Sequence, residues 1–122
     1  MKNLTIVRRT SHHAGHTVAS LKIEYPQARF LISKKGAELM EVKHEDGLMF
    51  GFNYKAKTAY AFKDDEIDSF RLYEKGKNDK GMRFTSKDLM NHFIDCFDLE
   101  IEKHVYFNIV KDQDKFKLML KK

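Results

Sequence analysis

The sequence predicts an α+β fold of mainly antiparallel strands, built from two strand-helix-hairpin repeats that follow an N-terminal β-hairpin. The first observation is that residues 29–34 (RFLISK) recur in shortened form as residues 83–87 (RFTSK). The second is that the same pieces follow each copy in the same order: a short apolar-periodic piece, an alternating run, a polar turn and a second alternating run. Because one repeat rarely buries its apolar face alone, we expect the two copies to pair.

The length and composition indicate one globular domain over residues 1–122. Apolar residues make up 42% of the chain and ten of them are Phe, which argues against disorder. The single cysteine, Cys96, excludes an intrachain disulfide framework and suits a reducing cytosol. The sequence shows neither a signal peptide nor a run of about 18 apolar residues, so we expect a cytoplasmic protein without a membrane partner.

The first 25 residues are expected to form a hairpin arm. Residues 3–9 and 18–25 nearly alternate between apolar and polar types, and the polar loop TSHHAGH separates them. Three histidines of this loop suit a transition metal, but no cysteine or acidic residue lies within it to complete a tetrahedral site, so we expect no metal. These histidines are His12, His13 and His16.

The first repeat is expected over residues 28–63. A strand over residues 28–32 leads to Ser33, whose hydroxyl suits the N-cap of a short helix. Period-2 alternation then predicts a hairpin, because aromatic and aliphatic side chains recur on one face of each run. The predicted elements are the helix at about 34–41, a turn at Asp46-Gly47, and strands over 48–54 and 58–62.

An acidic connector with a short strand is expected over residues 64–81, ahead of the second repeat at residues 82–120. Ser86 is the expected N-cap of a longer helix with one amphipathic stripe. Alternating runs then predict a closing hairpin with its turn at residues 112–114. The helix stripe is Leu89, Met90, Phe93, Ile94 and Phe97, and the hairpin faces are Val105, Phe107 and Ile109 with Phe116, Leu118 and Leu120.

The stretch RFLIS-KKGAELMEV-KHED-GLMFGF resembles the AbrB/SpoVT swapped-hairpin family, and residues 82–120 resemble it more loosely. Ile32-Ser33 stands where the family has Ile-Pro, and Asp46-Gly47 where it has Gly-Asp. The resemblance implies interleaved hairpins that bind DNA, with two copies in one chain as in the MraZ proteins. A second resemblance, to the Whirly and PUR-type binders of single-stranded nucleic acid, rests on architecture alone.

The net charge of +5 is concentrated in the first half of the chain. Residues 1–25 carry four Lys or Arg against one Glu, and residues 26–63 carry seven against four acidic residues. A basic face suits a polyanion such as DNA, although the same charge is also explained by solubility alone. The expected phosphate contacts are Arg8, Arg9, Arg29, Lys34, Lys35, Arg83 and Lys87.

The recurring Arg-Phe and Ser-Lys pairs favour two similar basic clusters. The alternative is that the repeated Phe and Ser serve folding alone.

Aromatic residues of the first hairpin are expected in the core, with Tyr54 and Tyr60 as exposed exceptions that suit base stacking. The sequence shows no P-loop, dinucleotide fingerprint or nucleophile elbow, so we expect no enzyme and no cofactor.

Two functional hypotheses follow from the sequence. The first is a small nucleic-acid-binding module, a DNA-binding transcription regulator that recognises either single- or double-stranded DNA through its basic face. The alternative is a non-enzymatic protein-interaction or homo-oligomeric assembly module, for example a phage-type accessory protein. Its support is the number of strands whose edges need a partner, together with the high Phe and Met content.

Overall fold

The computed structural model describes residues 18–76, 79–100 and 104–121. These residues form one antiparallel sheet of nine strands, in the order β5-β3-β4-β9-β8-β1-β2-β7-β6, together with two helices. The strands are β1 (Ser20–Glu24), β2 (Arg29–Ile32), β3 (Gly47–Asn53), β4 (Thr58–Lys63), β5 (Phe70–Arg71), β6 (Tyr73–Gly76), β7 (Asp79–Thr85), β8 (Val105–Asp112) and β9 (Lys115–Leu120), and the helices are α2 (Lys34–Met40) and α3 (Lys87–Phe97).

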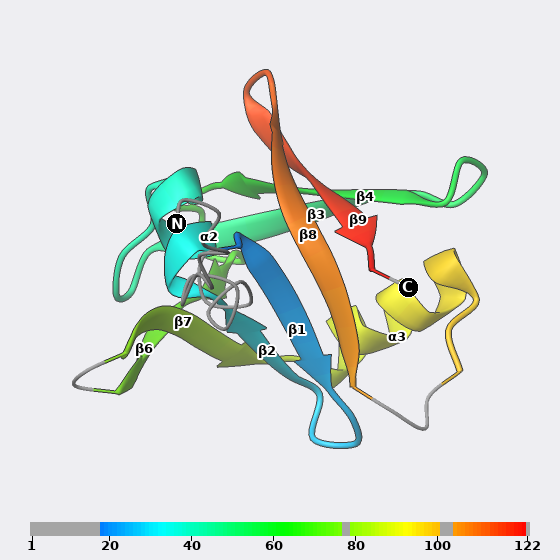
Figure 1. Cartoon of the computed structure of the whole chain (residues 1–122), viewed down its shortest axis with the longest axis horizontal. Coiled ribbons are helices and arrows are strands. Elements are labelled where there is room, and N and C mark those ends of the chain that lie inside the picture. Colours follow the sequence, from blue (N-terminus) through cyan, green and yellow to red (C-terminus); the bar gives the residue numbers. More distant parts are fainter. Residues whose placement is uncertain (1–17, 77–78, 101–103, 122) are drawn as a thin grey trace, which may run out of the picture.

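The sheet curls into a nearly closed barrel (Figure 1). Its two edge strands, β5 and β6, are consecutive in the chain and are separated by Leu72 alone. The Leu72 N–H donates to the carbonyl of Asp46 at 2.9 Å, and the Leu72 carbonyl accepts from the Glu45 N–H at 2.6 Å. β5 therefore pairs with β3, and β6, which begins one residue after Leu72, pairs with β7.

The predicted α+β fold of two strand-helix-hairpin repeats after an N-terminal hairpin is wrong. Strands make up 48% of the structure and helices 19%, and both predicted repeats contribute to one curled sheet. Strands pair across the expected repeat boundary, β2 with β7, β4 with β9 and β1 with β8. The physical reason is that a strand has two hydrogen-bonding edges, and a hairpin inside one repeat satisfies only one of them.

Of the expected N-terminal hairpin, the structure describes the second strand alone. Its second strand, β1, pairs with β2 and β8, and residues 3–9 lie outside the described residues. The expected connector likewise contains β5 and β6, which bring the two edges of the sheet together. The second strand of the expected arm and the short strand expected in the connector are thus part of the barrel wall.

Two helices cover the barrel at opposite sides, α2 against β7, β1 and β8, and α3 against β3 and β4 (Figure 1). Both predicted N-caps are confirmed. The Ser33 hydroxyl accepts from the N–H groups of Gly36 and Ser20, each at 3.0 Å, and the Ser86 hydroxyl accepts from the Leu89 N–H at 3.1 Å. The bonds from Gly36 and Leu89 satisfy helix-start N–H groups that would otherwise lack a partner, and the bond from Ser20 ties the start of α2 to β1.

Aromatic side chains fill the inside of the barrel. Phe93 of α3 is fully buried, and its ring lies 4.9 Å from Phe52, 5.1 Å from Phe107 and 5.7 Å from Phe30 between centroids. Because successive strand residues point to opposite faces, the residues between these buried positions point outward. The outer faces of the strands therefore carry the candidate functional residues.

Candidate nucleic-acid interface

A row of five side chains crosses the outer face of neighbouring strands. Tyr106 of β8 lies opposite Lys22 of β1, Lys22 opposite Leu31 of β2, Leu31 opposite Arg83 of β7, and Arg83 opposite Tyr73 of β6. We call these five residues the outer row. Tyr106 and Tyr73, at its two ends, are 44% and 40% exposed.

Some cations of this face have an acidic neighbour that compensates their positive charge, and others do not. The Lys22 ammonium lies 3.2 Å from a Glu24 carboxylate oxygen, and the Arg29 Nε donates to the other oxygen of the same carboxylate. Burial raises the pKa of Glu24, but the hydrogen bonds from Arg29 and Lys22 outweigh it and hold that pKa below its ordinary value. Glu24 is therefore negatively charged and compensates part of the positive charge of Lys22 and Arg29.

Arg83 is exposed and makes no ion pair with any described residue. Its neighbours across the sheet are the half-buried Leu31 and the exposed Tyr73. A guanidinium without a carboxylate partner keeps its charge and its donors available to an incoming anion. Arg83 is thus the cation of the outer row that is best placed to bind phosphate.

A hollow of about 400 Å³ opens beside Arg83, where β5 and β7 face each other. We call it the seam hollow. The rings of Phe70 and Phe84 line it and lie 5.5 Å apart between centroids. Arg71 also lines the hollow, and its guanidinium donates to the main-chain carbonyls of Glu45 and Asp65, both at 3.3 Å. The lining residues are Ser69, Phe70, Arg71, Tyr73, Arg83, Phe84 and Thr85.

Among the predicted site residues that the structure describes, Arg29 and Arg83 are the two that it brings from different strands to one face. Arg29 and Arg83 lie diagonally on the outer faces of paired strands, because Arg29 is opposite Thr85 and Leu31 is opposite Arg83. Lys34 and Lys35 begin α2 and Lys87 begins α3. Since β2 and β7 are antiparallel, the helices that follow them start at opposite ends of the pair. Arg8 and Arg9 lie outside the described residues.

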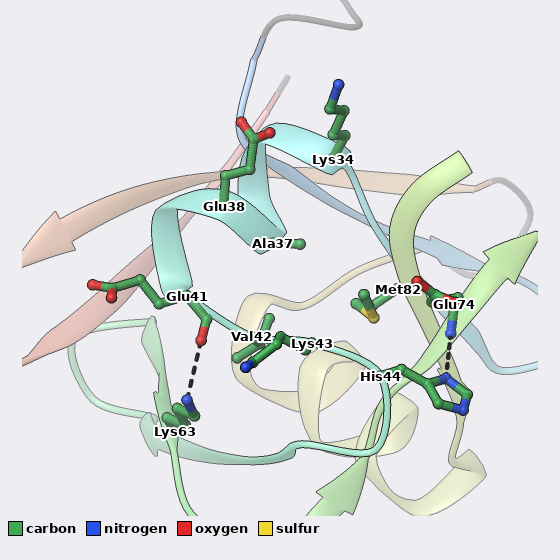
Figure 2. A pocket seen from close by; sticks show the side chains of 10 residues that line it. All are labelled: Lys34, Ala37, Glu38, Glu41, Val42, Lys43, His44, Lys63, Glu74 and Met82. Carbon is green, nitrogen blue, oxygen red and sulfur yellow. Dashed lines mark hydrogen bonds between the residues drawn. The ribbon is translucent and has the colours of Figure 1, made fainter. Parts of the chain in front are cut away.

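A larger hollow of about 940 Å³ lies beside α2 (Figure 2). Its buried apolar surface comes from Ala37, Val42 and Met82, and three lysines and three glutamates surround it. In Figure 2 the Lys34 side chain points away from this apolar surface. Because the charges balance, this hollow has no net preference for an anion. The lysines are Lys34, Lys43 and Lys63, and the glutamates are Glu38, Glu41 and Glu74.

The expected stacking residues lie elsewhere than on the outer row. The Tyr54 hydroxyl lies 2.6 Å from His92 Nδ1, and the ring of Tyr60 lies 5.1 Å beneath the Lys115 ammonium. Sequence reasoning missed Tyr106 and Tyr73 as exposed aromatic residues. For Tyr106 a signal existed, because it alternates with Val105 and Phe107, which were expected to face inward. For Tyr73 no such signal existed within the connector.

Cys96 is a buried thiol of α3 that lies against the end of the β3–β4 hairpin. Burial raises the pKa of this thiol, and its Sγ lies 3.7 Å from the carbonyl oxygens of Asn53 and Thr58, either of which can accept its proton in a hydrogen bond. Within the described ranges no three His, Cys, Asp or Glu side chains gather to hold a metal ion. The helices of those ranges include none that is long and apolar enough to span a membrane.

Comparison of the chain with protein-family models, curated proteins and solved structures gives no match. The resemblance to the AbrB/SpoVT family therefore stays a prediction from the sequence.

Proposed function

We propose that this chain is a small nucleic-acid-binding module, a DNA-binding regulator, and that it binds through the outer row. The observation that carries the proposal is Arg83, an exposed cation without an ion-pair partner among the described residues, set between Leu31 and Tyr73. A guanidinium binds a phosphate through paired N–H donors. The tyrosines at the two ends of the row supply ring faces on which bases stack.

The dimensions of the outer row suit a short stretch of nucleic acid. Its four strand-to-strand intervals of roughly 4.8 Å give a span of about 19 Å between the ends of the row. Lys22 lies 5.6 Å from the ring centroid of Tyr106, so cation and aromatic ring occur together at one end as Arg83 and Tyr73 do at the other. Alternation of cations with aromatic rings is typical of surfaces that contact phosphates and bases together.

A second candidate function rests on a different part of the barrel wall. Val110 of β8 and Met119 of β9 are 48% and 44% exposed, and Tyr60 lies beside them on β4, opposite Lys117. Exposed apolar side chains on neighbouring strands are typical of a protein-interaction surface. The alternative function is therefore a protein-interaction or homo-oligomeric assembly module, with this second face as its contact.

Fluorescence anisotropy with labelled single- and double-stranded DNA, at low and moderate salt and with heparin as competitor, distinguishes the two functions. The nucleic-acid function predicts binding that weakens several-fold as salt rises, because phosphate contacts release counterions. It also predicts a preference for one form of DNA over heparin. Absence of binding at low salt would contradict it, and sedimentation of the unliganded protein would then test self-association.

A further inference from the structure

The seam between β5 and β7 is a gap in the hydrogen bonding of the barrel. Among the described residues, no ladder and no backbone hydrogen bond joins these two strands. The N–H and C=O of one residue in an antiparallel strand point to the same side, and successive residues alternate. The hydrogen bonds of neighbouring residues therefore indicate to which side the main-chain N–H and C=O of each residue at the seam point.

On β7, the Ser86 N–H donates to the Ala28 carbonyl at 3.0 Å, so Ser86 and Phe84 direct their main chain toward β2. Thr85, between them, directs its main chain toward the seam. On the other side, the Leu72 N–H donates to the Asp46 carbonyl, so the main chain of Arg71 also points toward the seam. Two sets of main-chain donors and acceptors thus face each other across the seam without a strand partner.

The residues that line the seam hollow suit a ligand that is a single flat ring with polar atoms on its edge. Phe70 and Phe84 supply apolar surface, the ring of Tyr73 stands at the rim, and the main chain of Arg71 and Thr85 supplies donors and acceptors. A volume of about 400 Å³ falls within the usual range for small-ligand sites, about 300 to 1,000 Å³. Arg83 also lines the hollow and places a positive charge beside the bound ring.

We propose that the seam hollow binds one unpaired nucleobase, which makes the target of this module single-stranded. The inference rests on the proposed function, because Arg83 would hold the phosphate next to the inserted base. In a duplex the base edges are paired and the faces are stacked, so a base reaches a hollow of this kind only when it is unstacked. Duplex DNA would contact the outer row through its phosphates alone.

The test compares three labelled probes of equal charge per strand: a single-stranded oligonucleotide, the same strand in a duplex, and a strand whose bases are replaced by abasic sites. The wild-type protein is expected to bind the intact single strand about tenfold more tightly than the abasic strand, since one stacked base contributes on the order of 1–3 kcal/mol. It is also expected to prefer the single strand over the duplex.

Two variants test whether the preference for the intact strand over the abasic strand arises in the seam hollow. Thr85→Trp fills the hollow from an exposed position, and Tyr73→Ala removes the exposed ring at its rim, so thermal melts should stay within a few degrees of wild type. Each variant is expected to lose most of the preference for the intact strand, apart from the part that stacking on Tyr106 contributes, while keeping its salt dependence. The control Thr58→Trp, on the outer side of β4, is expected to keep the preference.

The possible results separate the two proposals. An unchanged preference in both hollow variants would overturn the base-binding hollow and leave the nucleic-acid function intact. Equal binding of intact and abasic strands by the wild-type protein would overturn both the base-binding hollow and base stacking on the outer row, and would leave only phosphate binding. Absence of binding to every probe at low salt would overturn the nucleic-acid function itself.

Discussion

Phe30 of β2 and Phe84 of β7 lie directly opposite each other in the sheet, and their rings stack with centroids 4.8 Å apart and planes inclined by 6°. These are the two Phe residues of the repeated Arg-Phe pair. Their stacking places the preceding residues, Arg29 and Arg83, on the outer face of the same two strands. The repeat thus serves the core through Phe and the outer face through Arg.

A double-mutant cycle tests the Phe30–Phe84 pair. Phe30→Leu and Phe84→Leu are expected to couple by about 0.5–1.5 kcal/mol, since stacked aromatic rings contribute beyond the area that they bury. Urea denaturation of both single variants and the double variant measures this coupling. As a control, Phe30→Leu with Phe116→Leu on the distant β9 should be additive within about 0.5 kcal/mol. Additivity in the first cycle would contradict the stacking.

Glu24→Gln is expected to lower stability at pH 7 by about 1 kcal/mol, because the carboxylate hydrogen-bonds Arg29 and lies within ion-pair distance of Lys22. The folded-state pKa of Glu24 is lowered, so its stabilisation is present above the unfolded-state pKa and is lost as pH falls through the folded-state pKa. Denaturation at pH 7 and pH 3 should show the gap between variant and wild type closing at the lower pH. A gap of equal size at both would refute the electrostatic origin.

The same substitution should tighten nucleic-acid binding. With the carboxylate gone, Lys22 and Arg29 are released toward the phosphates, and the face gains one unit of positive charge. Anisotropy titration at fixed salt is expected to give a several-fold lower Kd for Glu24→Gln than for wild type. Weaker binding would contradict the idea that Glu24 competes with the phosphates for Lys22 and Arg29.

Two glycines of β3 form a matched pair for testing the barrel closure. A Cβ at Gly47 would lie 2.1 Å from the Asp64 carbonyl oxygen and 2.2 Å from the Ser69 hydroxyl, whereas a Cβ at Gly51 meets no atom within 4 Å. Gly47→Ala is therefore expected to destabilise the protein by about 2 kcal/mol or more, and Gly51→Ala to leave it unchanged or slightly stabilised. Thermal melts that rank the variants in the opposite order would be incompatible with the packing at the start of β3.

The Cys96 thiol should resist modification in the folded protein. It is 1% exposed, and burial raises its pKa, so little reactive thiolate is present at pH 8. Labelling by a thiol reagent is expected to be roughly a hundredfold slower in buffer than in denaturant. Fast labelling under native conditions would mean that α3 does not stay packed against the barrel.

Local elements could be predicted from the sequence, but their assembly could not. Both serine caps and both later hairpins follow from capping chemistry and period-2 alternation, which depend on residues close in the chain. The pairing of β1 with β8 joins residues that lie more than 80 positions apart, and strand alternation carries no signal for that partner. Strand edges had to be satisfied somewhere, but the sequence did not indicate where.

The candidate site shows the same division. Arg29 and Arg83 were predicted from the repeat, and the structure brings them to one face. Lys34 and Lys87 were predicted from the same repeat and lie at opposite ends of the strand pair, because the antiparallel arrangement of β2 and β7 separates the helix starts. Tyr73 and the seam hollow depend on the barrel closure, which local patterns do not specify.

The most direct test of the central claim is a pair of charge reversals of equal size. Arg83→Glu lies in the outer row, and Lys55→Glu lies in the exposed turn between β3 and β4, far from β6 in Figure 1. Each lowers the net charge from +5 by two. Anisotropy titration with single-stranded DNA at low salt should give at least a tenfold loss of affinity for Arg83→Glu and less than a threefold loss for Lys55→Glu, with a shallower salt dependence in the first. Equal losses in both variants would show that binding follows the overall charge, and the outer row would then not be the binding site.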